Sequence, residues 1–193
     1  MITYAEYQNF VVGLMSSAST VDGKSKMATA AFGLTAESGE FLDHIKKILF
    51  HGADQLEHRQ EMIKELGDIM FYVTFAASVF NSNVENLMSK KSSFDIQTNI
   101  NVFYHLLGLA GVTGRYADIT LKCILNGKDN SALLIDEMEN VILYVSFAAN
   151  LIGSNIQEAI EGNVVKLSSR YKNKTFTVEE FKSKEAAKHY ETT

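Results

Sequence analysis

The chain has 193 residues, 46% of them hydrophobic, and a net charge of −5. That length provides a well-formed core for one domain or two small ones, and the acidic balance excludes a protein that binds a nucleic-acid backbone through a basic face. The single cysteine, Cys123, excludes an internal disulfide and suits a reducing compartment. The longest apolar stretch, residues 69–80, is too short to span a bilayer. The N-terminus lacks the basic region of a signal peptide. We therefore expect a soluble, cytoplasmic protein that binds neither nucleic acid nor membrane.

The expected secondary structure is helical throughout. The chain contains no proline, its glycines lie between periodic apolar segments, and no alternation typical of strands persists. The predicted helices span residues 4–17, 25–50, 58–80, a short segment after residue 82, 100–126, 131–152 and 155–171, and a polar helix opens at Thr177. The predicted fold class is therefore all-α.

The second half of the chain repeats the first. The segment from Gly33 to Asp43 recurs 75 residues later, and the segment from Tyr72 to Ala77 recurs 72 residues later. Capping boxes are predicted soon after each copy of the second segment, beginning at Ser82 and at Ser154. Matches in the same order indicate an internal duplication. We expect a helical bundle of two tandem hairpin units packed as an intrachain pseudo-dimer, with units at residues 1–95 and 96–176 and a helical tail at 177–193.

Two acidic couplets stand out in the first unit, Glu37-x-x-Glu40 and Glu65-x-x-Asp68. Residues three apart share a helix face, so two packed helices would gather four carboxylates around one small volume. At about 5 Å and an effective dielectric of about 20, each like-charged pair costs roughly 3 kcal/mol. A hard divalent cation would remove that cost. The alternative is a solvated acidic face without function.

The second unit has lost most of these acids. The counterparts of the four acids, in order, are Val112, Arg115, Glu137 and Asn140. This divergence favours one retained metal site and one abandoned twin. The second unit instead carries Asn163, Lys166 and Arg170 on one helical face, a set suited to phosphate. In the first unit, Lys47 lies on the acidic stripe and is a further cation for an anionic substrate, whereas His44 and His51 are expected to be surface residues.

These residues carry a family resemblance. The chain resembles the MazG-like nucleotide pyrophosphohydrolases of the all-α NTP pyrophosphatase superfamily over roughly residues 4–176. The segments that carry the resemblance are Glu6-Tyr7-Gln8, Gly33-Leu34, Glu37-Ser-Gly-Glu40, Lys46-Lys47, the region 51–54, Glu65-Leu-Gly-Asp68 and Asn163–Tyr171. The chain departs from the family in having two unequal repeats, in Lys64 where an acid is common, and in Phe71 where tryptophan is common.

The resemblance implies magnesium-dependent hydrolysis of an NTP or dNTP to the monophosphate and pyrophosphate, with manganese as a substitute metal. It implies that the metal is held by Glu37, Glu40, Glu65 and Asp68. One of the first two acids would accept the proton of the attacking water. The substrate-binding residues that it implies are Lys47, Tyr72, Asn163, Lys166, Arg170 and Tyr171, with Tyr72 near the base.

Two other functions are weighed against hydrolysis. One is a catalytically inactive protein that binds or senses nucleotides. The other is a ferritin-like di-iron bundle, which needs Glu-x-x-His motifs that this sequence lacks. Base and sugar preference, the role of the tail, and a homodimer of such pseudo-dimers are left open.

Overall fold

The computed structural model describes residues 1–16, 22–90 and 102–171, and these residues form helices and no strand. The helices are α1 (Tyr4–Ser16), α2 (Gly23–His51), α3 (Gln55–Val79), α4 (Val84–Lys90), α5 (Val102–Asn126), α6 (Ser131–Leu151) and α7 (Ile156–Arg170). The all-α prediction is confirmed, and each predicted helix in this part of the chain is present. The polar helix expected after Thr177 lies outside the described residues. Among the described helices, none combines the length and the hydropathy that a membrane span requires.

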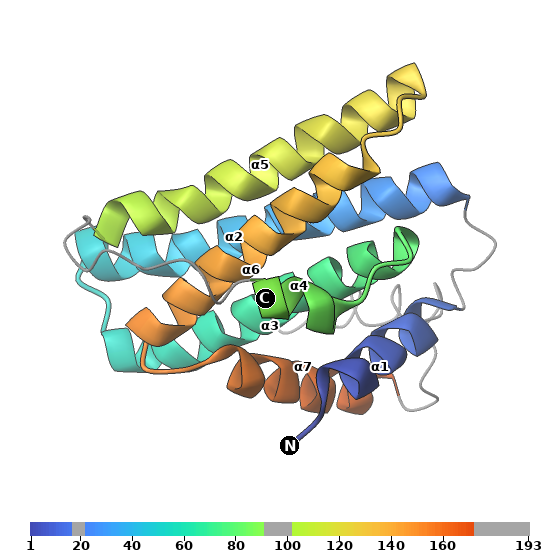
Figure 1. Ribbon diagram of the computed structural model, residues 1–193. Coiled ribbons are helices and arrows are strands. Elements are labelled where there is room, and N and C mark those ends of the chain that lie inside the picture. The colour runs from blue at the N-terminus through green and yellow to red at the C-terminus, as the bar shows by residue number, and fades with distance from the viewer. Residues whose placement is uncertain (17–21, 91–101, 172–193) are drawn as a thin grey trace, which may run out of the picture.

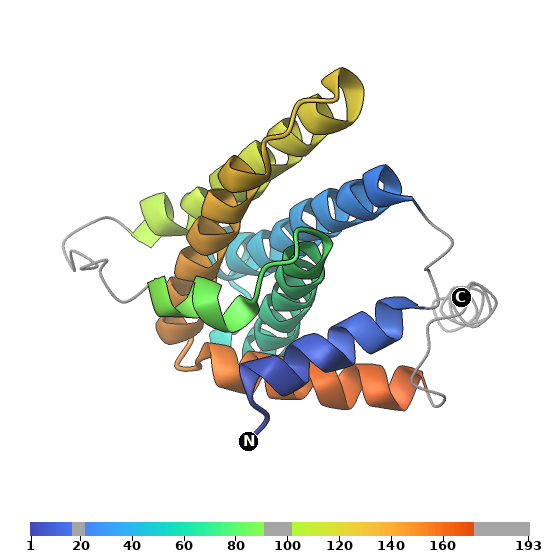
Figure 2. The same cartoon turned by 45° about the vertical axis from the view of Figure 1, so that its right-hand side comes forward.

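The bundle is built from two helical hairpins, with the terminal helices packed on one of them. The short connections after α2 and α5 make α2 and α3 antiparallel neighbours, and likewise α5 and α6. Helix α2 packs along α5, and α3 packs against α6 and α7. Figures 1 and 2 show α1 and α7 next to each other beside α3. A continuous core of buried apolar side chains joins the two hairpins.

Several helix starts differ from the predictions. Helix α3 begins at Gln55 rather than at residue 58, because the Asp54 side chain accepts hydrogen bonds from the first free backbone N–H groups. The capping boxes predicted at Ser82 and Ser154 were wrong by one residue. The backbone N–H groups of these serines donate at 2.8 Å to the preceding helix, at Ala77 O and Ala149 O respectively. Each serine therefore closes the earlier helix, and Asn83 and Asn155 cap the next one.

Each of the two hairpins contains the same kind of close contact, between a glycine on its first helix and a tyrosine on its second helix. A Cβ atom added to Gly33 would lie 2.3 Å from the ring of Tyr72, and one added to Gly108 would lie 2.2 Å from the ring of Tyr144. In both hairpins, only a glycine on the first helix lets the tyrosine of the second helix pack this closely. The division into two repeats and a tail stays a prediction.

The contact between α3 and α7 depends on Gly67. A Cβ atom there would lie 2.6 Å from the carbonyl oxygen of Ala159 and 3.1 Å from Cβ of Asn163. Since a backbone carbonyl cannot rotate away, we expect Gly67→Ala to push the helices apart and to lower the free energy of unfolding by about 1–3 kcal/mol. Urea denaturation measures this change.

The matched control is Gly39→Ala in α2, where the added Cβ atom meets nothing within 4 Å. Alanine is favoured over glycine inside a helix by about 1 kcal/mol, so this variant should be as stable as the wild type or more so. Equal effects of the two substitutions would contradict the close contact at Gly67.

Candidate metal centre and substrate cleft

Three of the four predicted acids meet between α2 and α3. One carboxylate oxygen from each of Glu37, Glu65 and Asp68 lies within 4.8 Å of the others. The antiparallel hairpin places the middle of α2 beside the middle of α3, which brings the two couplets to the same level. Glu40 lines the same cleft but is not in the three-acid cluster. As a metal ligand, Glu40 stays a prediction.

The electrostatics of the cluster favour a cation. Burial, and after it the charges of Asp68, Glu40 and Glu65, raises the pKa of Glu37 to about 8. Burial and the neighbouring acids also raise the pKa of Glu65. Without a cation, the cluster therefore retains protons that an ordinary carboxyl releases. The donor set consists of carboxylate oxygens alone, which are the ligands that Mg²⁺ and Mn²⁺ prefer, so these residues fit a hard divalent ion.

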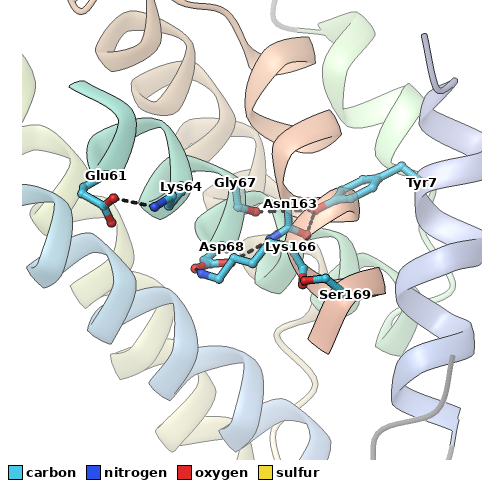
Figure 3. A network of polar contacts seen from close by, with 8 residues as sticks. All are labelled: Tyr7, Glu61, Lys64, Gly67, Asp68, Asn163, Lys166 and Ser169. Atoms are coloured by element: carbon cyan, nitrogen blue, oxygen red, sulfur yellow. Dashed lines mark hydrogen bonds and ion pairs between the residues drawn. The ribbon is translucent and has the colours of Figure 1, made fainter. Parts of the chain in front are cut away.

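Asp68 is held on both of its oxygens by α7. Asn163 Nδ2 donates to Oδ1 at 2.6 Å, and the Lys166 ammonium forms an ion pair with Oδ2. Asn163 in turn accepts a hydrogen bond from the Tyr7 hydroxyl of α1, at 3.0 Å from Oδ1 (Figure 3). Burial, followed by the charge of Asp68, raises the pKa of Tyr7 well above its usual value, so its hydroxyl remains a donor.

The cluster opens into a charged cleft of about 400 Å³. The cleft is lined by Glu37, Glu40, Glu61, Lys64, Glu65, Asp68, Lys166 and Arg170. Lys64 lies in its wall and pairs with Glu61. The three basic side chains give this acidic cleft a cationic side, which suits a metal-bound polyphosphate.

A second, largely apolar pocket of about 440 Å³ adjoins the charged cleft. Four residues line both cavities: Glu37, Asp68, Lys166 and Arg170. The remaining wall includes Phe71, Tyr72, Phe75 and Tyr171, with Leu14 and Met15 of α1. The structure therefore places Tyr72 and Tyr171, both predicted to bind substrate, in an aromatic pocket that begins where the charged cleft ends.

Lys47 was predicted to bind substrate, but the structure places it outside both the charged cleft and the aromatic pocket. Its ammonium lies 2.8 Å from the Asp43 carboxylate, one helical turn away, and Lys47 lines neither of the two cavities. Its phosphate-binding role stays a prediction. His51 is exposed, as expected. His44 is partly buried, with its Nδ1 2.7 Å from His58 Nδ1, so it links α2 to α3 and is not a simple surface residue.

The counterpart region of the second hairpin carries an ion pair instead of an acid cluster. The Arg115 guanidinium binds both carboxylate oxygens of Glu137, at 2.9 and 3.2 Å. Val112, the counterpart of Glu37, is buried. Glu137, which the sequence aligns with Glu65, therefore has a cation from its own chain, and the residues there do not fit a metal.

The raised pKa of Glu37 predicts an unusual dependence of stability on pH. Between pH 4.5 and about 8 the folded, metal-free protein holds a proton on Glu37 that the unfolded chain releases, so the free energy of unfolding falls as pH rises. Glutamine carries no ionisable proton, so in Glu37→Gln the free energy of unfolding does not fall with pH for this reason. At pH 8.5 we expect its Tm to exceed that of the wild type by at least about 2–4 °C, the shift that 1 kcal/mol produces in a chain of this size.

Differential scanning calorimetry without metal measures this difference. Near pH 4 both side chains are uncharged, and the two melting temperatures should converge. Added Mg²⁺ should stabilise the wild type more than Glu37→Gln, reversing the order at pH 8.5. A difference in Tm that is the same at both pH values would contradict the assignment.

The comparisons with known proteins agree with this geometry. Residues 26–100 match the family model described as the MazG nucleotide pyrophosphohydrolase domain. The match begins inside α2 and covers α3 and α4, and it therefore includes all four acids of the two couplets. No curated protein and no solved structure matches the chain significantly. The family resemblance predicted from the sequence is confirmed over residues 26–100, whereas its extension to residues 4–176 and the second repeat stay predictions.

Proposed function

We propose that this chain, which carries a MazG nucleotide pyrophosphohydrolase domain over residues 26–100, hydrolyses a nucleoside triphosphate to the monophosphate and pyrophosphate with Mg²⁺. The domain indicates nucleotide pyrophosphohydrolase activity in general, and such domains use divalent metals. The observation that carries the more specific proposal is the shared wall of the two cavities. Two acids of the cluster, Glu37 and Asp68, and two cations, Lys166 and Arg170, line both the charged cleft and the aromatic pocket. A metal-bound polyphosphate in the cleft would therefore have an aromatic pocket beside it for the base.

In this proposal Glu37, Glu65 and Asp68 hold the metal. A divalent ion bound there polarises phosphoryl oxygens and lowers the pKa of a bound water. Manganese would substitute for magnesium, because it accepts the same oxygen ligands. The attacking water needs a proton acceptor within hydrogen-bond reach. Glu40 lines the cleft outside the three-acid cluster, so we assign this role to Glu40.

The cations and aromatic rings would orient the nucleotide. Lys166 and Arg170 line both cavities and would contact phosphates that lie between the cleft and the pocket. Tyr72 and Phe71, whose rings meet edge to face at a centroid distance of 5.3 Å, would contact the base with Tyr171. One catalytic site per chain follows, because the second hairpin carries the ion pair between Arg115 and Glu137 at the corresponding position.

The proposal is tested by the products. With Mg²⁺ and a nucleoside triphosphate, phosphorus NMR should show the monophosphate and pyrophosphate forming in equal amounts. Release of orthophosphate and a diphosphate would contradict the proposed bond cleavage. Metal-dependent nucleotide binding without any product would instead support the alternative of an inactive binding or sensing protein.

A further inference from the structure

A chain of hydrogen bonds reaches the acid cluster from α1, which lies outside the family match. Tyr7 is fully buried, and its hydroxyl lies 3.0 Å from Oδ1 of Asn163 and 3.5 Å from the carbonyl oxygen of Gly67, so Asn163 is the closer acceptor. Asn163, 1% exposed, donates from Nδ2 to Oδ1 of Asp68 at 2.6 Å. Figure 3 shows the three side chains in line from α1 through α7 to α3. These residues are 156 and 95 positions apart in the sequence, so the contacts exist only in the folded bundle.

The tyrosine determines which way the asparagine amide faces. A carboxamide has a donor end and an acceptor end. The Tyr7 hydroxyl occupies the acceptor end, so the donor end must face Asp68. If the amide were reversed, its oxygen would face the carboxylate oxygen, and two acceptors would meet in a buried site. The hydroxyl therefore selects the one amide orientation that supports Asp68.

Asp68 in turn has a separate partner on each oxygen. Asn163 holds Oδ1 with a neutral donor on a buried side chain, whereas Lys166 holds Oδ2 through a flexible stem whose side chain is 31% exposed. A metal that takes one oxygen of Asp68 can displace the lysine ammonium more easily than the buried amide. The amide would thus keep its hold on Oδ1 if a metal took the place of the ammonium at Oδ2.

We propose that Tyr7 is a positioning residue for the metal centre, and that it acts through Asn163 to hold the Asp68 carboxylate in the orientation that binds a divalent cation. The inference rests on the proposed function in that it takes the acid cluster as a metal site. Groups that orient metal ligands affect metal affinity by about 10–100-fold when removed. Tyr7 would therefore alter metal binding without touching metal or substrate.

The test is calorimetric titration of Mn²⁺ into the nucleotide-free full chain. Tyr7→Phe keeps the packed ring and removes only the hydroxyl, and Asn163→Ala breaks the same link from the other end. Both should bind Mn²⁺ about 10–100-fold more weakly than the wild type. If Tyr7 acts through Asn163, and not through the more distant Gly67 carbonyl, the double variant should bind no more weakly than Asn163→Ala alone.

The matched control is Tyr116→Phe. Tyr116 is likewise fully buried, lies on α5, and has a phenylalanine, Phe41, as its counterpart in the first hairpin. This variant should bind Mn²⁺ as the wild type does, which separates positioning from a general effect of removing a buried hydroxyl. Circular dichroism establishes that each variant is folded.

Two results would overturn the inference: wild-type affinity in Tyr7→Phe, or losses in Tyr7→Phe and Asn163→Ala that add in the double variant. A wild-type protein that binds no Mn²⁺ would overturn both this inference and the proposed function. Wild-type Mn²⁺ binding that weakens as expected in Tyr7→Phe, in a protein that hydrolyses no nucleotide, would overturn the proposed function alone.

Discussion

Asp68→Asn should abolish pyrophosphate release while leaving the helical bundle intact. Asp68 is the acid with the most complete support, since Asn163 and Lys166 each hold one of its oxygens. Removing a group that only orients a metal ligand costs about 10–100-fold in activity or metal affinity, so removing the ligand's charge should cost more than about 100-fold in kcat.

The fold should tolerate this change, because asparagine already occupies the corresponding position of the second hairpin, at Asn140. The matched control is Asp118→Asn on α5, which removes one carboxylate charge from a side chain that lines neither cavity. Steady-state kinetics and circular dichroism measure the two effects. An active Asp68→Asn enzyme would exclude the acid cluster as the catalytic metal site.

Lys166→Met should separate metal binding from turnover. The lysine ammonium pairs with Asp68 and also lines both cavities. Since the ammonium would compete with a metal bound at Asp68, its removal should leave the affinity for Mn²⁺ in the absence of nucleotide unchanged or increased. Since it would also contact the phosphates, kcat/KM should fall about 10–100-fold, the equivalent of the 1.5–3 kcal/mol that a charge-assisted hydrogen bond contributes.

Calorimetric titration and initial-rate kinetics on the same preparation provide the two quantities. Lys122→Met is the control, because Lys122 is a surface lysine of α5 that pairs with Asp118 and lines neither cavity. Parallel losses of metal affinity and activity in Lys166→Met would show that the lysine supports the metal site and does not bind phosphate.

Local patterns in the sequence were sufficient for the helices and for bringing together three of the four acids, Glu37, Glu65 and Asp68. Apolar periodicity and the glycines between segments set the helix order, and the three-residue spacing placed each acidic couplet on one helix face. The errors at Ser82 and Ser154 arose because the preceding helix binds these serines through its own C-terminal carbonyl groups. A residue between two helices can close the first helix or cap the second, and the capping-box motif describes only the second helix.

Features that depend on how distant helices converge could not be predicted in this way. Lys47 pairs with Asp43, and no pattern along the acidic stripe shows which partner a flexible lysine selects. The contact between His44 and His58 crosses the loop between α2 and α3. The aromatic pocket combines side chains of α1, α2, α3 and α7. Tyr7 was part of the segment Glu6-Tyr7-Gln8 that carried the family resemblance, but its partner Asn163 is 156 residues away.

The most direct test of the central claim is pyrophosphate release from a panel of ribonucleoside and deoxyribonucleoside triphosphates. The wild type and Asp68→Asn would be assayed side by side, with Mg²⁺ and with a chelator. We predict that the wild type releases pyrophosphate only with the metal and that Asp68→Asn releases none. The rates for the different triphosphates would then give the base preference. Release that persists in the chelator or in Asp68→Asn would contradict a metal centre at the acid cluster, and no release from any nucleotide in the panel would contradict hydrolysis of these triphosphates.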